Sequence, residues 1–165
     1  MFSYASVRYF TPHMAHEHFA IRPDIMTCGK ALQVGATLSS RSWFPEEGSM
    51  SSTWGGGHVI DMMVGVETIR TIKKDRLLGK VKSRGRYLRK ALMDLPKVKD
   101  VRGLGLMNAF DLSSTKERGK FIDACVRKGL VLLPCGLKGV RVIPPFIVEE
   151  SDLDCTVQIM DEVLR

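Results

Sequence analysis

The sequence predicts a globular α/β protein, and three observations support this prediction. Stretches with apolar residues at helical spacing alternate with short β-branched or leucine-rich runs, in the order helix, strand, helix, strand, strand, helix. Of the 165 residues, 44% are hydrophobic and 26% are charged, which is ordinary for a folded chain with a core. No apolar run reaches the length of a membrane span.

The first half of the chain divides into a strand, a loop and two helices. An apolar run that ends in a turn predicts a strand at residues 23–30. Residues 37–57 are rich in Ser and Gly and predict a loop. Apolar residues then recur at helical spacing from Val59, and again from Leu77 until Pro96 stops the second helix.

The second half predicts a smaller α/β arrangement. Residues 101–112 are expected to form a strand whose two glycines mark a bulge or a close backbone approach. Ser113 or Ser114 is expected to cap a helix that runs to about Lys128. Two short strands and a last helix complete the order, at residues 130–133, at residues 140–143 and from Ser151.

The charge pattern bears on possible partners. The net charge is +7, and ten basic residues stand against one acidic residue between positions 70 and 90. This run fits either the solvated face of a helix or a nucleic-acid surface, and no aromatic interleaving or recognition motif supports nucleic acid. Four widely spaced cysteines and the absence of a leader pattern predict a reduced, cytoplasmic protein without a membrane partner. His16 and His18 lack a third ligand, so no metal site is expected.

Three segments carry residues suited to chemistry. Lys30 follows Gly29 at the end of the first strand, where a turn can direct its amine into a cleft. The run Ser52-Thr53-Trp54-Gly55-Gly56-Gly57 precedes a long helix and fits either a phosphate site or a helix cap with a flexible lead-in. Arg141 lies in a short apolar strand, so it is either a member of an ion pair or a fork for a carboxylate.

These segments, in this order, resemble the class III aminotransferases that use pyridoxal phosphate. The likeness extends from about Ala15 to the C-terminus and includes the run from Arg102 to Leu112. Within that class, the Thr-Trp-Gly-Gly run and the Gly-Leu-Met-x-Ala-Phe strand favour the lysine ε-aminotransferase subfamily over the ornithine and acetylornithine enzymes. His16-Glu17-His18-Phe19 and Gly29-Lys30-Ala31-Leu32-Gln33-Val34 add to the likeness.

The resemblance implies a fold, a reaction and site residues. The fold would be that of fold-type I pyridoxal-phosphate enzymes, and Lys30 would form the Schiff base with the cofactor and then move protons. Ser52 and Thr53 would bind the cofactor phosphate, with Thr53 contributed across a homodimer. Arg141 would pair with a substrate carboxylate. The reaction would transfer the ε-amino group of L-lysine to 2-oxoglutarate.

The resemblance also implies how the chain is divided. Residues 1–58 would belong to the large cofactor-binding domain, 59–74 to a bridging helix and 75–165 to the small C-terminal α/β domain. The match corresponds to about the C-terminal third of the family's chain. The Asp-Glu-x-Gln run that holds the cofactor ring nitrogen would precede the matched part, so exposed edges and apolar surface are expected. Other class III activities (ornithine, acetylornithine or 4-aminobutyrate) and an inactive remnant that acts only with a full-length partner remain alternatives.

Overall fold

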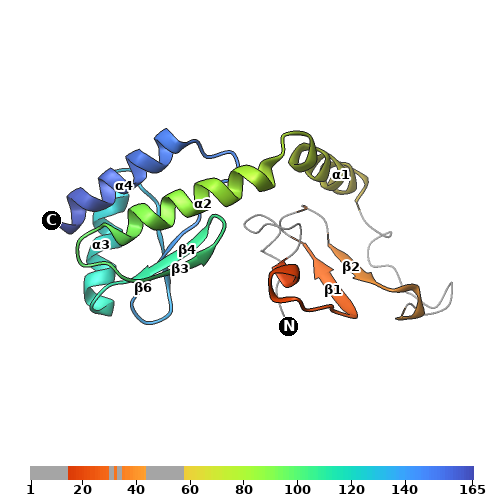
Figure 1. Ribbon diagram of the computed structural model, residues 1–165, viewed down its shortest axis with the longest axis horizontal. Coiled ribbons are helices and arrows are strands. Elements are labelled where there is room, and N and C mark those ends of the chain that lie inside the picture. The colour runs from red at the N-terminus through yellow and green to blue at the C-terminus, as the bar shows by residue number, and fades with distance from the viewer. Residues whose placement is uncertain (1–14, 30–31, 33–34, 44–57) are drawn as a thin grey trace. The chain divides into compact units, whose positions relative to one another are not determined.

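The computed structural model describes residues 15–29, 32, 35–43 and 58–165. The chain divides into two compact units, Met1–Leu78 and Gly79–Arg165 (Figure 1). No helix within the described ranges is long and apolar enough to cross a membrane.

The first unit contains a small antiparallel pair of strands. Its described elements are η2 (Ala15–Phe19), β1 (Ile25–Cys28), β2 (Ala36–Ser39), η4 (Arg41–Trp43) and α1 (Val59–Lys74). Ile25 of β1 lies opposite Ser39 of β2, and the Ser39 hydroxyl donates to the Asp24 carbonyl at 2.8 Å. Strand β1 confirms the strand expected at residues 23–30, whereas β2 corrects the loop expected from residue 37. A four-residue strand carries too little pattern to be recognised before its partner is known.

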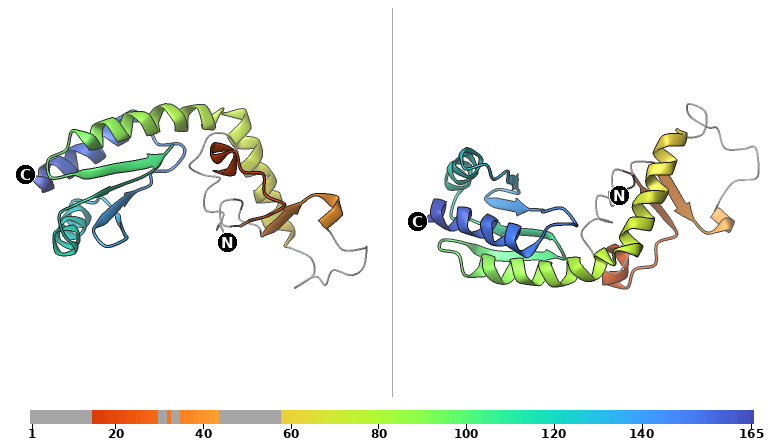
Figure 2. Two further views of the ribbon diagram at one scale, coloured as in Figure 1. Left: turned by 60° about the horizontal axis from the view of Figure 1, so that its bottom comes forward. Right: turned by 90° about the horizontal axis from the view of Figure 1, so that it is seen from above.

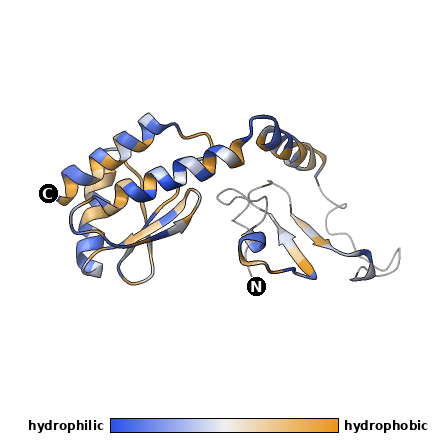
Figure 3. Ribbon diagram, viewed as in Figure 1, coloured by the Kyte–Doolittle hydropathy of each residue, from blue (hydrophilic) through white to orange (hydrophobic). Residues whose placement is uncertain are grey.

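Helix α1 begins where the spacing predicted, but most of its apolar side chains remain exposed. Gly65 is its buried residue, and Figure 3 shows hydrophobic residues along the helix. The exposed apolar residues, which we call the α1 apolar arc, are Val59, Ile60, Met62, Met63, Val64, Val66 and Ile69. An ordinary surface helix would turn such residues toward a core.

The second unit is a four-stranded antiparallel sheet with helices. Its elements are α2 (Leu77–Met93, which leads into the unit), β3 (Lys99–Leu104), β4 (Met107–Asp111), α3 (Thr115–Arg127), β5 (Leu133–Cys135), β6 (Gly139–Val142) and α4 (Glu150–Leu164). The strand order is β3-β4-β6-β5. Strand β3 is irregular between Lys99 and Arg102, and Pro134 lies within the edge strand β5.

The two faces of this sheet differ in burial. Phe110 of β4 and its cross-strand neighbour Val140 of β6 are fully buried. The Phe110 ring meets that of Phe121 on α3 edge-on, with 5.9 Å between ring centroids. The residues that alternate with them, Ala109 and Arg141, are half-buried and share the other face. One face therefore packs against the core, and the opposite face is the more open one.

Helices α2 and α4 lie side by side on the core side (Figure 2). Arg84 of α2 forms an ion pair with Glu149, the residue that caps the N-terminus of α4. The Tyr87 hydroxyl donates to Asp154 on α4, and this hydrogen bond raises the pKa of Tyr87. Burial of Leu88 on α2 and Leu153 on α4 completes the contact with a shared apolar core.

The run expected as one strand over residues 101–112 is a β-hairpin. Gly105, with φ of 53°, starts the turn between β3 and β4, and the side chain of Leu106 is fully buried there. A buried turn residue keeps the apolar run continuous in sequence, which hides the turn. The expectation of a close backbone approach is confirmed, because a Cβ at Gly103 would lie 2.7 Å from the Asn108 Cα.

Helix α2 also approaches this turn closely. A Cβ placed on Gly85 would lie 2.8 Å from the Cα of Gly105 and even closer to its carbonyl group. Only a glycine at position 85 therefore lets the helix backbone rest directly on the hairpin turn. This contact fixes the hairpin against α2.

The remaining boundaries of the second unit differ only locally from the predictions. Ser114 caps α3, with its hydroxyl accepting from the Glu117 amide at 3.1 Å, as one of the two expected caps. The strand expected at residues 130–133 is shifted to β5, which pairs with β6. Helix α4 starts one residue earlier than expected because Glu149 and Asp152 form a reciprocal capping box.

Candidate active site

The structure describes one of the four predicted site residues. Lys30, Ser52 and Thr53 lie outside the described residues, so their predicted roles stay predictions. Strand β1 ends at Cys28, and Gly29 follows it directly before Lys30. Arg141 lies in β6 of the second unit.

Arg141 lies in the middle of the open face of the sheet. The register places Ala109 of β4 on one side of it and Leu133 of β5 on the other. Cross-strand neighbours point to the same face of an antiparallel sheet, so these two apolar side chains border the arginine. Leu133 is half exposed, and Arg141 itself is half-buried. A guanidinium group in this position lies on a partly apolar, partly open surface.

The guanidinium of Arg141 is not neutralised by the described part of the protein. No ion pair to Arg141 occurs among the described residues, and its buried Nε has no hydrogen-bond partner there. A buried donor without a partner carries a desolvation cost, and a bidentate carboxylate removes that cost. No partner for the ion-pair alternative occurs among the described residues, and the carboxylate fork stays a prediction.

A carboxylate on the same face of the sheet, that of Asp111, is engaged elsewhere. Asp111 lies two residues beyond Ala109 on β4 and accepts from Arg102 at 2.9 Å, while Lys138 approaches it at 3.9 Å. Arg102 also pairs with Asp100 at 2.8 Å. The hydrogen bond to Asp111 raises the pKa of Arg102, so Arg102 stays charged. Asp111 thus pairs with Arg102 and Lys138, and no pair between Asp111 and Arg141 occurs.

Polar groups on the core side hold the strand next to Arg141. The Asn108 amide is buried, donates to the Gly105 carbonyl at 3.1 Å and accepts from Arg89 of α2 at 3.0 Å. Arg89 also donates to the Gly105 carbonyl at 3.1 Å, and burial lowers the pKa of Arg89. Asn108 pairs across the sheet with Val142, the residue after Arg141. The network therefore anchors the β4–β6 pair to α2.

These contacts correct part of the interpretation of the basic run. Its residue Arg84 is buried and Arg89 is half-buried, and each reaches from α2 to a specific acceptor in the second unit. Their acceptors lie far away in sequence, which a helical spacing pattern cannot reveal. The exposed members, such as Lys80 and Lys90, agree with a solvated face.

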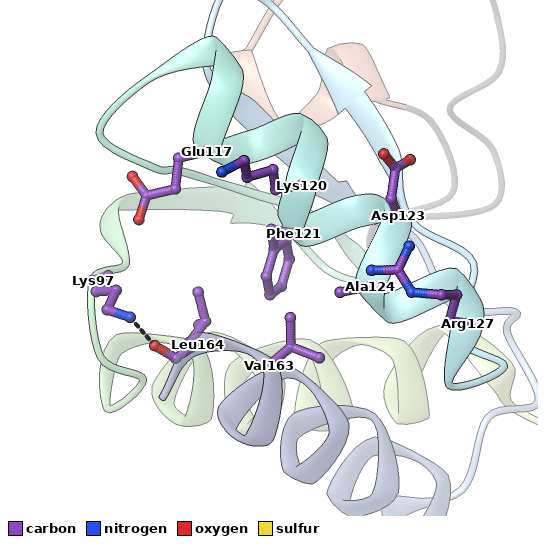
Figure 4. A pocket seen from close by; sticks show the side chains of 9 residues that line it. All are labelled: Lys97, Glu117, Lys120, Phe121, Asp123, Ala124, Arg127, Val163 and Leu164. Atoms are coloured by element: carbon purple, nitrogen blue, oxygen red, sulfur yellow. Dashed lines mark hydrogen bonds between the residues drawn. The ribbon is translucent and has the colours of Figure 1, made fainter.

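A groove between α3 and α4 lies away from Arg141 (Figure 4). Phe121 points from α3 toward Val163 and Leu164 on α4 and fills its floor. The Lys97 ammonium donates to the Leu164 carbonyl and so satisfies the last turn of α4. Phe121 and Lys97 thus maintain the fold in this groove. We therefore place the candidate site at Arg141. The described residues contain no group of His, Cys, Asp and Glu side chains that could hold a metal ion.

The arrangement of strands and helices is that of fold-type I pyridoxal-phosphate-dependent enzymes. A solved lysine aminotransferase from M. tuberculosis, in its internal aldimine form, superimposes with a TM-score of 0.85 and 30% identity. The superposition covers 92% of this chain and 38% of that one. The family model for "Aminotransferase class-III" matches residues 12–164. The chain belongs to the class III aminotransferase family, whose cofactor is pyridoxal phosphate.

Curated relatives support the same family and differ in their named substrates. The L-lysine-epsilon aminotransferase of Amycolatopsis lactamdurans is 36% identical over 157 residues, which span 85% of this chain and 34% of that protein. The acetylornithine aminotransferase of Synechocystis sp. is 31% identical over 161 residues, which span 90% of this chain and 37% of that protein. The chain thus spans little more than a third of the length of the relatives it matches.

The chemistry of the donor set fits the family's cofactor. Lys30 offers an amine for an aldehyde, and Ser52 and Thr53 offer hydroxyl groups for a phosphate. Arg141, with its buried and unpaired Nε, fits the carboxylate of an amino acid or oxo acid.

Sequence reasoning missed the surroundings of Arg141. Ala109 and Leu133 border it only because of the strand register, which a single sequence does not specify. One signal was available, since Arg141 alternates with two valines, and period-two alternation places it opposite the buried face. Asn108 gave no signal, because its partners come from a helix and a turn.

Proposed function

We propose that this chain forms part of an L-lysine 6-transaminase, which moves the ε-amino group of L-lysine to 2-oxoglutarate in lysine catabolism. Family membership supports the reaction class, and the 36% identity to the Amycolatopsis lactamdurans enzyme supports lysine as the donor. The observation that carries the site is Arg141. Its Nε has no hydrogen-bond partner among the described residues, and it lies on a partly apolar face, which suits recognition of an aliphatic carboxylate.

Each proposed residue has a distinct task. Lys30 would hold pyridoxal phosphate through its amine, and Ser52 and Thr53 would hold the phosphate. When bound, the cofactor supplies an electron sink for the carbon that carries the transferred nitrogen. The Nζ of Lys30 would take up the proton from that carbon and deliver it on the cofactor's side of the transferred nitrogen. Arg141 would orient the substrate by its carboxylate, with Leu133 and Ala109 alongside its aliphatic part.

A second amino donor has support of its own. The acetylornithine aminotransferase of Synechocystis sp. is 31% identical over a slightly longer part of the chain. N-acetylornithine also bears a carboxylate at one end and a transferable amine at the other, so Arg141 suits both donors. The choice between them therefore depends on a comparison of the two substrates.

The proposal also divides the chain into domains. We assign residues 1–58 to the large cofactor-binding domain, 59–74 to a bridging helix and 75–165 to the small domain. A homodimer in the cytoplasm, with Thr53 contributed across the subunit interface, follows from the family resemblance.

The first experiment is reductive labelling. The purified chain is mixed with pyridoxal phosphate, reduced with borohydride, and the modified lysine is mapped by mass spectrometry. We expect one label per chain at Lys30 and its loss in Lys30→Arg, which keeps the charge and removes the primary amine. Label scattered over surface lysines, or an unchanged amount in Lys30→Arg, would show that Lys30 does not hold the cofactor.

A second experiment tests the amino donor. L-lysine and N-acetylornithine are added separately to the cofactor-loaded chain, and the absorbance of the bound cofactor is followed. We expect a faster change with L-lysine. A faster change with N-acetylornithine would assign the chain to the acetylornithine activity, and Arg141→Met should slow both reactions.

A further inference from the structure

Helix α2 carries a line of basic side chains on the side that faces away from the core of the second unit. Lys82, Arg86 and Lys90 are exposed and follow one another at four-residue intervals, and Figure 3 shows hydrophilic residues along the length of α2. At 100° per residue the three lie within roughly 80° of the helix circumference, and at 1.5 Å per residue they extend over roughly 12 Å. We call these three residues the α2 basic stripe.

The charges of the α2 basic stripe have no partners in the described part of the chain. No side chain of the stripe forms an ion pair or a hydrogen bond with another described residue. In contrast, Arg84 and Arg89 of the same helix are held by Glu149 and by the Gly105 carbonyl. Burial lowers the pKa of Arg89, and the charge of Arg86 lowers it further, so positive charge accumulates along this helix.

The stripe differs from an ordinary solvated helix surface. Such a surface mixes both signs of charge, as α3 does with two acidic and five basic residues in its sequence. No acidic residue occurs in the α2 sequence. Like charges four residues apart destabilise a helix, and both Lys82–Arg86 and Arg86–Lys90 are such pairs. A line of uncompensated charge of one sign therefore favours an anionic partner.

The surroundings of the stripe indicate which kind of anion it suits. A helix that binds an acidic membrane also inserts an apolar face, and the apolar face of α2 is buried through residues such as Leu88 and Leu92. Single-stranded nucleic acid is bound by stacking on aromatic rings, and the hydroxyl of Tyr87, the aromatic residue of α2, is held by Asp154 of α4. The backbone of a duplex needs neither feature. It presents one charge per about 1.7 Å, so a line of roughly 12 Å faces about seven charges.

We propose that the α2 basic stripe binds the phosphate backbone of double-stranded nucleic acid without reading its sequence. Contacts to phosphates carry no sequence information, so they need no recognition motif. The inference goes beyond the transaminase proposal and does not depend on it, because the stripe includes neither Lys30 nor Arg141.

The test is fluorescence anisotropy with the purified chain and a labelled DNA duplex of about 20 base pairs. We expect a dissociation constant in the micromolar range at about 50 mM salt, and the same value for a second duplex of unrelated sequence. Three phosphate contacts give a log–log salt slope of about −2.7, which corresponds to a loss of about 40-fold in affinity between 50 and 200 mM salt. Undetectable binding at the lower salt concentration, or a slope near zero, would overturn the proposal.

Two matched triple variants locate the contact. One replaces all three residues of the stripe with glutamine, and the other replaces three exposed cations of α3 in the same way, Lys116→Gln, Lys120→Gln and Arg127→Gln. Both remove three positive charges from exposed positions, so both should unfold thermally like the wild type. We expect the stripe variant to lose at least about tenfold in affinity and the α3 variant less than about twofold. Equal losses would show that net charge alone causes the binding and would overturn the proposal.

A single variant and three other anions complete the test. Arg86→Gln should make the salt slope shallower by about 0.9, because one phosphate contact is lost, and an unchanged slope would contradict the contact. The chain is also titrated with a labelled single strand of the same length, with vesicles that contain phosphatidylserine, and with poly-glutamate. Tighter binding to any of these than to the duplex would overturn the assignment of the stripe to duplex nucleic acid.

Discussion

Replacement of Gly85 by alanine tests the contact between α2 and the hairpin turn. A Cβ at this position would lie 2.8 Å from the Gly105 Cα and closer still to the carbonyl of that residue. Backbone atoms cannot rotate away as the end of a long side chain can. The helix must therefore move off the hairpin, which also stretches the hydrogen bonds that Arg89 donates to the turn.

Two opposing terms set the size of the effect. Overpacking in a well-packed site costs about 1–3 kcal/mol, and a clash with backbone belongs at the upper end of that range. Alanine is better than glycine in a helix interior by about 1 kcal/mol. The net loss of unfolding free energy is therefore about 2 kcal/mol, which lowers the melting temperature of a domain this size by about 10 °C.

The control is a helical glycine with free space around it. Gly119 lies in the middle of α3, and a Cβ there would meet nothing within 4 Å. Gly119→Ala should raise the unfolding free energy by about 0.5–1 kcal/mol through helix propensity alone. Both variants are followed by far-UV circular dichroism during heating and in urea. If Gly85→Ala is as stable as Gly119→Ala, the close approach of α2 to the turn is wrong.

Four further outcomes are expected from the second unit. Ser114→Ala should lower the unfolding free energy by about 1 kcal/mol in urea, because the Glu117 amide loses its acceptor. Arg141→Met should change it by less than about 0.5 kcal/mol and weaken 2-oxoglutarate binding about tenfold or more, as measured by titration, since no described residue pairs with this arginine. Burial raises the pKa of the Cys125 thiol to about 11, so iodoacetamide at pH 8 should modify the exposed Cys155 and spare Cys125. Because only the unfolded thiol ionises between its ordinary value of 9.0 and about 11, stability should fall as the pH rises through that interval.

Elements with a strong local signal could be predicted from the sequence. Helices α1 and α2 begin at Val59 and Leu77, as the spacing of their apolar residues predicted, and Ser114 caps α3. The hairpin was missed because Leu106, in the turn, is buried and continues the apolar run. Such a turn depends on contacts with α2, which are distant in sequence.

In the candidate site, too, local features could be predicted from the sequence and contacts between distant segments could not. The position of Arg141 in a strand and its outward face could be predicted, since the alternation of its neighbours is local information. The lack of a compensating carboxylate among the residues that the structure describes could not be predicted, because it depends on Arg102 and Lys138 engaging Asp111 from two other segments. The predicted roles of Lys30, Ser52 and Thr53 remain for the labelling experiment.

The edges of the sheet have a consequence for aggregation. Strand β5 is three residues long and contains Pro134, which has no amide hydrogen to offer an incoming strand. Strand β3, at the other edge, is irregular between Lys99 and Arg102 and carries charged residues. Both features are known to discourage the addition of a foreign strand. Any tendency of this chain to precipitate should therefore originate in exposed apolar residues such as those of α1 and not in this four-stranded sheet, and a charged substitution in the first two turns of α1 should improve recovery of the chain.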